Sequence, residues 1–415
     1  MPIKTTPLLS TYFFLSNYLY PLAFISPRVR TGWKEKCLQK KPLPTDILIQ
    51  AASVGESKLA LLVAEKLLDQ YPGLKITIST NTKQGKDILS QANNLHQIVY
   101  FPLDSSKWQK KFLKALKPKL VLILETEIWP SFFYQLKKQK IPFAIINGRM
   151  RSKTFSHYLF AQKSLAPLFP DLILAISPKD SLRFKTLFPQ SQITTIPNLK
   201  FELLDLSTEP LDYVKNPLSR YFPPQKNILV LGSVRKEEEE QIFWLIQNYL
   251  QAAPQAIIAL FPRHMERIPY WQNKLKDFKY ILRSQLTRQV KTGEIILWDK
   301  IGELGFAYAL AKRAFVGGSL QPLGGQNFLE PLAQGIIPFV GPYLDNFLWV
   351  GEELFAAQLV IRVKDEKELL QALLRPQKEN RKKIYLQAKE ILALQKGGLN
   401  LVLKQLAPLL RFYSS

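Results

Sequence analysis

The residues best suited to chemistry lie in one glycine-rich segment late in the chain, residues 314–342. A glycine-rich loop that leads into a helix presents N–H groups to a phosphate. We expect that helix over residues 326–334, which would place Gln326 and Glu330 on one face, with the carboxylate able to bind a ribose diol. A tight strand–helix junction is the alternative, but Gln326, Asn327 and Glu330 favour a nucleotide. The glycines concerned are Gly317, Gly318, Gly324 and Gly325.

Other polar clusters follow directly after short apolar runs. Three of them lie in the first half of the chain and begin at Ser53, Glu125 and Asn147, and two lie in the second half, at Ser233 and Arg263. In an open parallel sheet, ligand sites lie at the carboxyl ends of the strands. The clusters therefore mark the edge where a site is expected in each half.

The elements that must position these clusters alternate between apolar runs and segments of helical periodicity. Continuous apolar runs indicate strands buried on both faces, as in a parallel sheet. The alternation predicts an α/β fold with two Rossmann-like, doubly wound domains facing a cleft, the GT-B architecture of glycosyltransferases. The expected strands cover residues 46–52, 75–80, 97–101, 120–125, 143–147, 172–177, 227–233, 256–261, 294–298, 314–317 and 336–340.

With 415 residues the chain exceeds the size of a single core. A proline-bearing stretch separates the two alternating regions, and we interpret it as a linker. A final helix at about residues 397–412 can return to the first domain. The expected organisation is an anchor at 1–30, an acceptor domain at 31–205, a linker at 206–225, a donor domain at 226–395 and the returning helix at 396–415.

The charge balance narrows the class of partner. Lys and Arg number 57 against 33 Asp and Glu, a net charge of +24. Such a field favours an anionic partner, whether nucleic acid, anionic membrane or a phosphorylated substrate. The aromatic residues lie mostly in strand and N-terminal runs rather than interleaved with Lys and Arg, which argues against nucleic acid. The single cysteine, Cys37, excludes an internal disulfide and a thiolate metal cluster.

The N-terminus carries an uncharged, aromatic-rich stretch at residues 7–25. Its length is just enough to span a bilayer, and its tyrosines suit the interface. Basic residues between positions 28 and 41 follow it, against a lone Lys4 before it. This asymmetry predicts a membrane anchor, spanning or interfacial, with the rest of the chain in the cytoplasm. An apolar helix packed on the first domain is the alternative.

Eight motifs occur in one order and resemble the 3-deoxy-D-manno-octulosonic acid (Kdo) transferases of lipopolysaccharide assembly. The similarity spans about residues 47–346. The motifs are ASVGE (52–56), ETEIWP (125–130), NGRM (147–150), NLKFE (198–202), GS (232–233), PRHMER (262–267), IGEL (301–304) and GGSLQPLGGQNFLEP (317–331).

The resemblance implies transfer of Kdo from CMP-Kdo to the lipid A precursor lipid IVA, at the cytoplasmic face of the inner membrane. It implies an inverting single displacement without a cofactor, and the absence of an Asp-x-Asp motif argues against a bound metal. Glu56 is the expected general base and Glu125 the second catalytic carboxylate. The expected substrate-binding residues are Ser53, Gly55, Glu127, Arg149 and Lys200. The expected donor-binding residues are Ser233, Arg263, His264, Ser319, Gly324, Gly325, Gln326, Asn327 and Glu330.

The chain departs from the family pattern at three positions. Arg235 and Gln326 stand where the family usually has His, and Pro197 stands where it usually has Gly. An epimerase of nucleotide sugars on the same architecture and a basic nucleic-acid-binding protein are the competing hypotheses. No motif encodes how many Kdo residues are added or through which linkages.

Overall fold

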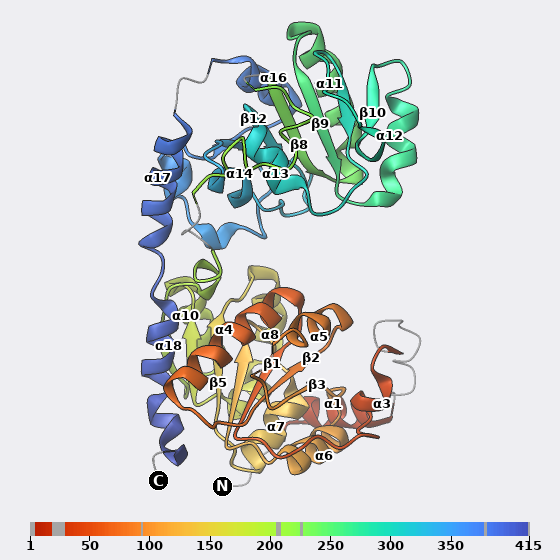
Figure 1. Cartoon of the computed structure of the whole chain (residues 1–415). Coiled ribbons are helices and arrows are strands. Elements are labelled where there is room, and N and C mark those ends of the chain that lie inside the picture. The colour runs from red at the N-terminus through yellow and green to blue at the C-terminus, as the bar shows by residue number, and fades with distance from the viewer. Residues whose placement is uncertain are drawn as a thin grey trace. The chain divides into compact units, whose positions relative to one another are not determined.

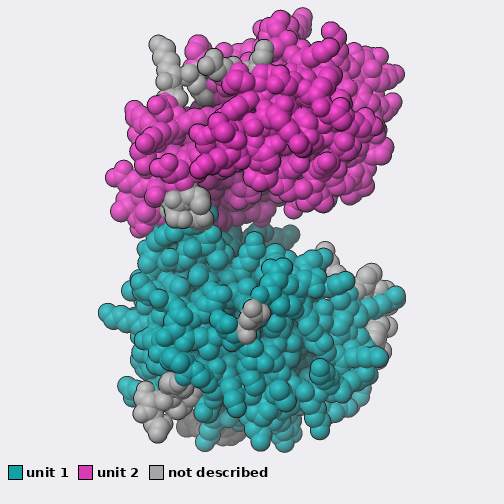
Figure 2. Space-filling view, in the orientation of Figure 1, with its two compact units in different colours: residues 1–204, 395–415 teal, residues 205–394 magenta. Residues whose placement is uncertain are grey.

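Continuous apolar runs form strands that are buried on both faces, and the chain divides into two units around two such sheets. The computed structural model describes residues 5–18, 30–92, 94–204, 209–224, 227–376 and 380–413. One unit comprises residues 1–204 together with 395–415, and the other comprises residues 205–394 (Figure 2). Each unit is an α/β sandwich with helices packed on both faces of a parallel sheet (Figure 1).

The first unit contains a seven-stranded parallel sheet in the order β3-β2-β1-β4-β5-β6-β7. The order reverses direction at β1 and β4, which is where a doubly wound sheet opens a ligand crevice. The strands are β1 (Ile47–Ala51), β2 (Ile76–Thr80), β3 (Gln97–Tyr100), β4 (Leu120–Leu124), β5 (Phe143–Gly148), β6 (Leu172–Ala175) and β7 (Gln192–Thr195).

Alternate side chains of these strands enter two cores. Ile47 and Ile49 pack with helices α4, α5 and α18 on one face, whereas Leu48 packs with α1, α6, α7 and α10 on the other. The helices are α1 (Pro7–Tyr18), α3 (Trp33–Lys36), α4 (Val54–Gln70), α5 (Lys83–Leu89), α6 (Ser106–Leu116), α7 (Pro130–Lys138), α8 (Ser152–Phe160), α9 (Gln162–Leu165), α10 (Pro178–Leu187) and α18 (Gly398–Leu406).

The second unit repeats the arrangement with the order β10-β11-β9-β8-β12-β13-β14, and its reversal lies at β8 and β12. Helices α11, α12 and α16 cover one face of this sheet. The strands are β8 (Ile228–Val234), β9 (Ile257–Pro262), β10 (Tyr280–Leu282), β11 (Ile295–Leu297), β12 (Arg313–Val316), β13 (Pro338–Val340) and β14 (Ile361–Arg362). The helices are α11 (Glu239–Ala252), α12 (Ile268–Lys274), α13 (Leu304–Leu310), α14 (Leu329–Ala333), α15 (Glu353–Ala356), α16 (Glu366–Leu374) and α17 (Arg381–Ala393).

The segment expected to be a linker packs as part of the second unit wherever it is described. Leu218 and Phe222 are buried, and the Asn216 amide donates to the Phe306 carbonyl at 2.8 Å. The Val290 N–H donates to the Tyr221 carbonyl at 2.8 Å. These contacts make residues 209–224 a layer on the second sheet and not an extended connection between units.

The N-terminal apolar stretch is described only in part, since residues 19–25 lie outside the described residues. Residues 7–18 form α1, whose Phe13 ring packs on Tyr134 with centroids 4.9 Å apart. Among the helices that the structure describes, none combines the length and the apolar character needed to cross a bilayer.

Candidate active site

At the carboxyl end of β1, Ser53 and Glu56 fold back on each other at the start of α4. The Ser53 hydroxyl accepts from the Glu56 N–H at 3.3 Å and donates to Glu56 Oε1 at 2.8 Å. The Ala52 N–H donates to Glu56 Oε2 at 2.7 Å. This is a capping box, in which a Ser and a Glu three residues later satisfy the free N–H groups of a helix start. Glu56 therefore has a structural role in this helix, whatever chemistry it also performs.

Three carboxylates meet where the strand order reverses. Glu125 follows β4 with a left-handed φ of 55°, and its Oε1 lies 2.6 Å from Lys200 Nζ. Glu127 lies close enough to both Glu56 and Glu125 for their charges to raise its pKa. The fold thus brings Glu56, Glu125, Glu127 and Lys200 together from three separate segments, as the positions of their motifs predicted.

Burial shifts the proton affinity of this cluster. Desolvation raises the pKa of Glu127 to about 7, and the neighbouring charge of Glu56 adds to the effect. Desolvation also raises the pKa of Glu56, and the Glu125 charge acts in the same direction, against hydrogen bonds from Ala52 and Ser53 and the charge of Lys200. Carboxyl groups that titrate near neutral pH are suited to accept a proton from a substrate.

The other residues expected in this unit surround the cluster. Asn147 has a φ of 57° and its Oδ1 accepts from the Leu199 N–H at 2.8 Å, which ties the NGRM segment to the NLKFE segment. Arg149 is half-buried just after β5, and Gly55 is exposed with no atom within 4 Å of an added Cβ. Gly55 therefore leaves open space beside Glu56.

In the second unit, the glycine-rich loop does not present free N–H groups as expected. The N–H groups of Gly317, Gly325 and Gln326 donate to the carbonyls of Gly232, Gly318 and Gly317, at 2.8, 2.7 and 3.1 Å. The following helix, α14, begins at Leu329 and contains five residues, so the expected helix start at 326 is wrong. Gln326 lies outside the helix and does not share a helix face with Glu330.

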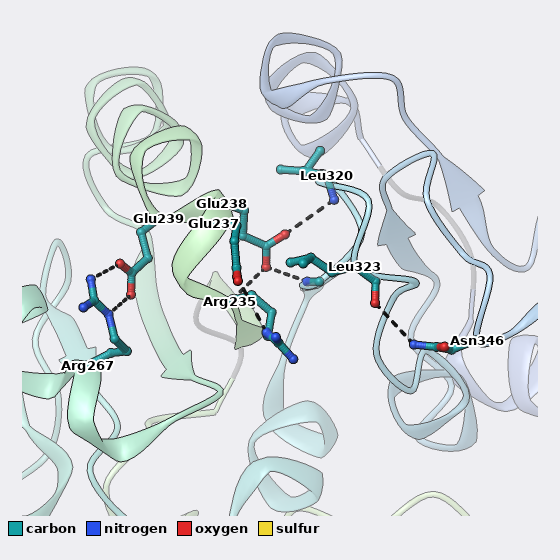
Figure 3. Close-up of polar contacts among 9 residues, drawn as sticks. Arg235, Glu237, Glu238, Glu239, Arg267, Leu320, Leu323 and Asn346 are labelled. Atoms are coloured by element: carbon teal, nitrogen blue, oxygen red, sulfur yellow. Dashed lines mark hydrogen bonds and ion pairs between the residues drawn. The ribbon is translucent and has the colours of Figure 1, made fainter. Parts of the chain in front are cut away.

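A buried glutamate that the sequence reasoning missed closes the loop (Figure 3). Glu238 is fully buried, and its carboxylate accepts from the N–H groups of Gly318 at 2.5 Å, Arg235 at 2.9 Å and Leu320 at 3.4 Å. Desolvation raises its pKa, while these hydrogen bonds oppose that shift. Gly317 must lack a side chain because an added Cβ would lie 2.4 Å from Glu238 Oε1. The position of Glu238 shortly after Ser233 repeats that of Glu56 after Ser53, and this repetition was the available signal.

Three of the expected donor contacts have internal roles instead. Ser319 is fully buried; its hydroxyl donates to the Val316 carbonyl at 2.7 Å and accepts from the Gly341 N–H at 2.8 Å. Gly324 and Gly325 are also buried, and their φ angles of 86° and 76° pack the loop against residues 343–346. These three residues are not placed to contact a phosphate.

The remaining expected residues line the edge formed by the ends of β8 and β9 and the start of α14. Ser233 has a φ of 57° and creates a bulge at the end of β8. Asn327 Nδ2 donates to Glu330 Oε1 at 3.0 Å. Although Glu330 is solvent-accessible, desolvation raises its pKa, against the Asn327 hydrogen bond and the nearby Arg263 charge. Arg263 and His264 are exposed just after β9.

Two parallel doubly wound units, each with polar groups at its strand reversal, define the GT-B class of fold. A solved glycosyltransferase from Rickettsia africae shares this fold, with a TM-score of 0.56 and 12% identity over 89% of this chain and 99% of that one. A UDP-GlcNAc 2-epimerase from Neisseria meningitidis is also similar, with a TM-score of 0.52 and 13% identity over 84% of this chain and 99% of that one. At these identities the likeness concerns the fold alone.

The family is defined by sequence comparison. Residues 28–203 match the family described as 3-deoxy-D-manno-octulosonic-acid transferase. The 3-deoxy-D-manno-octulosonic acid transferase of Haemophilus influenzae is 31% identical over 380 residues, which is 89% of this chain and 88% of that protein. The chain belongs to the Kdo transferase family of lipopolysaccharide biosynthesis, as the eight motifs predicted.

Proposed function

We propose that this chain transfers Kdo from CMP-Kdo to the lipid A precursor lipid IVA by an inverting single displacement, with Glu56 as the general base. The observation that carries the proposal is the buried carboxylate cluster at the ends of β1 and β4, in a chain of the Kdo transferase family. Open space beside Gly55 and raised proton affinities are what a proton acceptor for a hydroxyl needs.

In the proposed reaction the acceptor oxygen attacks the anomeric carbon of Kdo and loses its proton to Glu56. The bond from that carbon to the phosphate oxygen breaks, and its electron pair leaves with CMP. Lys200 holds Glu125 in place to orient the sugar acid, and Glu127 and Arg149 bind on the same side. No covalent intermediate is required, since one base and one leaving group complete the exchange.

On the donor side we assign Glu330 to the ribose hydroxyls and Arg263 to the phosphate or the Kdo carboxylate. Glu330 is exposed and held by Asn327, and Arg263 lies near enough to influence its pKa. A guanidinium suits either anion because it offers paired donors in one plane. Ser233 and Gln326 lie at the same edge, and His264 supports it from the end of β9.

We place the protein at the cytoplasmic face of the inner membrane, bound to anionic lipid through the first unit. Helix α1 leaves Leu8, Phe14, Leu15 and Tyr18 exposed, and α8 leaves Phe160 90% exposed. The Thr6 hydroxyl lies 2.5 Å from that of Ser164, just beyond α8. Apolar side chains on neighbouring helices of a strongly basic protein suit a lipid interface.

Replacing Glu56 by Gln tests the proposal. A capping box accepts Gln in place of Glu, so α4 should keep its start while the proton acceptor is lost. Single-turnover transfer at saturating CMP-Kdo and lipid IVA should slow by roughly 10²–10⁴. Binding of both substrates should survive.

The matched control is Glu65→Gln, which removes an exposed carboxylate from the same helix and should leave the rate unchanged. A Glu56→Gln protein that keeps more than about a tenth of the wild-type rate would exclude Glu56 as the base. Glu125 and Glu127 would then be tested in the same assay.

A further inference from the structure

The closed glycine-rich loop leaves a question about the anion in the second unit. Within the described residues, its N–H groups at 317, 318, 320, 325 and 326 already donate to protein oxygens. The helix after the loop has five residues and offers no long dipole. A phosphate at this edge therefore needs donors from side chains.

Arg235 is the cation nearest the loop that the proposed function leaves unassigned. It follows β8, and its side chain lies beside Gly318, where an added Cβ would be 3.4 Å from Arg235 Cγ. The same Cβ would be 3.2 Å from Nε2 of Gln326. The Arg235 guanidinium and the Gln326 amide thus come from different segments to one place.

The guanidinium of Arg235 is incompletely used within the protein. Its Nε is buried and makes no hydrogen bond within the part of the chain that the structure describes. The nearest carboxylate, Glu237, is 3.8 Å away, too far for a hydrogen bond. By contrast, the carboxylate of Glu239 binds Arg267 through both of its oxygens, so Arg267 is already paired (Figure 3). Arg235 alone of these two arginines keeps donors for a ligand.

We infer that Arg235 and Gln326 form the subsite for the leaving phosphate of the donor nucleotide, an inference that rests on the proposed function. The guanidinium supplies charged donors in one plane, and the amide supplies one more. When the bond to the sugar breaks, the electron pair moves to the phosphate oxygen, and a cation held there stabilises the added charge.

The pairing also accounts for the two substitutions near the donor. Arg235 and Gln326 are the positions at which the chain departs from the histidines of the family pattern, and the structure places them side by side. A histidine loses its charge near neutral pH, whereas an arginine keeps it. The subsite therefore carries the same positive charge across the physiological pH range.

The test compares CMP with cytidine, which lacks the phosphate, by titration calorimetry on the full-length protein. Arg235→Gln should weaken CMP binding by roughly 10- to 100-fold, the loss expected for charged hydrogen bonds, and leave cytidine binding unchanged. Lys236→Gln removes the same charge from the next, exposed residue and should change neither affinity. Thermal unfolding of each variant checks that the fold is kept.

The outcomes separate this inference from the proposed function. If the wild-type protein binds CMP no more tightly than cytidine, the proposed donor is wrong and the subsite falls with it. If the wild type prefers CMP and Arg235→Gln keeps that preference, only the subsite is wrong. Equal losses in Arg235→Gln and Lys236→Gln would also overturn it, because they would reflect net charge and not a contact.

Discussion

At the scale of single residues, Glu127 carries the largest consequence for pH. Its pKa of about 7 lies above the ordinary value of a glutamate, so between about pH 4.5 and 7 the folded protein holds a proton that the unfolded chain has lost. Folding stability must therefore fall as pH rises through this window. The cause is burial beside Glu56 and Glu125, whose negative charges oppose ionisation.

Glu127→Gln should remove that part of the pH dependence. Between pH 5 and pH 8 the unfolding free energy of the wild type should fall by about 1–2 kcal/mol more than that of the variant, allowing for partial solvent screening. Urea unfolding at the two pH values measures the difference. Glu65→Gln, an exposed site, should follow the wild type. Parallel curves for wild type and Glu127→Gln would show that Glu127 is not desolvated.

Residue roles were predictable from the sequence where they depend on strand ends, and not where they depend on distant segments. Glu56, Glu125 and Glu127 follow apolar strands that pair in the sheet, so their meeting was foreseeable. The hydrogen bonds of Glu238 to Gly318 and Leu320 join residues some 80 positions apart. Nothing local in the glycine-rich segment indicates that its N–H groups already have a partner.

At the scale of elements, every strand that was missed lies at the edge of a sheet. β7, β10 and β14 are each the outermost strand of their sheet, and none of them is fully buried. A central strand needs apolar side chains on both faces, whereas an edge strand does not. The rule that found the central strands therefore could not find these three.

The late start of α14 has a local cause. The Asn327 side-chain oxygen accepts from the Leu329 N–H at 3.2 Å, which satisfies a donor at the helix start and fixes the boundary there. The pattern from Gln326 to Glu330 is compatible with a helix, and the capping role of Asn327 is what decides against it. The Gln326 side chain is thereby released from the helix and reaches Gly318.

Helix α1 is attached to the first unit by one polar contact among its apolar ones. The Tyr12 hydroxyl donates to Asp104 Oδ2 at 2.8 Å, and Asp104 also accepts from the N–H groups of Ser131 and Phe132. Burial raises the pKa of Asp104 to about 6, and these hydrogen bonds limit the shift. The contact joins α1 to the beginning of α7.

Tyr12→Phe should loosen α1 specifically. A buried carboxylate that loses one donor costs about 1–3 kcal/mol. Hydrogen exchange of amides in residues 7–18 should accelerate, while exchange in α18 should not change. Tyr18→Phe is the control, because Tyr18 is 70% exposed on the same helix. Unchanged exchange in α1 would mean that apolar packing alone holds this helix.

At the scale of the whole molecule, the chain leaves the first unit at about residue 204 and returns to it at 395. The return is fixed at its start, where the Gly397 N–H donates to Glu202 Oε1 at 2.7 Å. Leu399, Val402 and Leu406 then enter the core that contains β1. A unit whose core is completed only by the last residues of the chain can reach its full stability only once those residues are present.

Leu406→Ala should therefore destabilise the first unit without affecting the second. Leu406 is fully buried, and a Leu to Ala change at such a site costs about 2–5 kcal/mol through lost burial and the cavity left behind. Hydrogen exchange under mildly denaturing conditions should accelerate in β1 and remain unchanged in β8, because β8 belongs to the other unit. Leu401→Ala, at a position 38% exposed on the same helix, should have a much smaller effect. Equal acceleration in β1 and β8 would show that the two units unfold together, and that the boundary at 395 does not separate their stabilities.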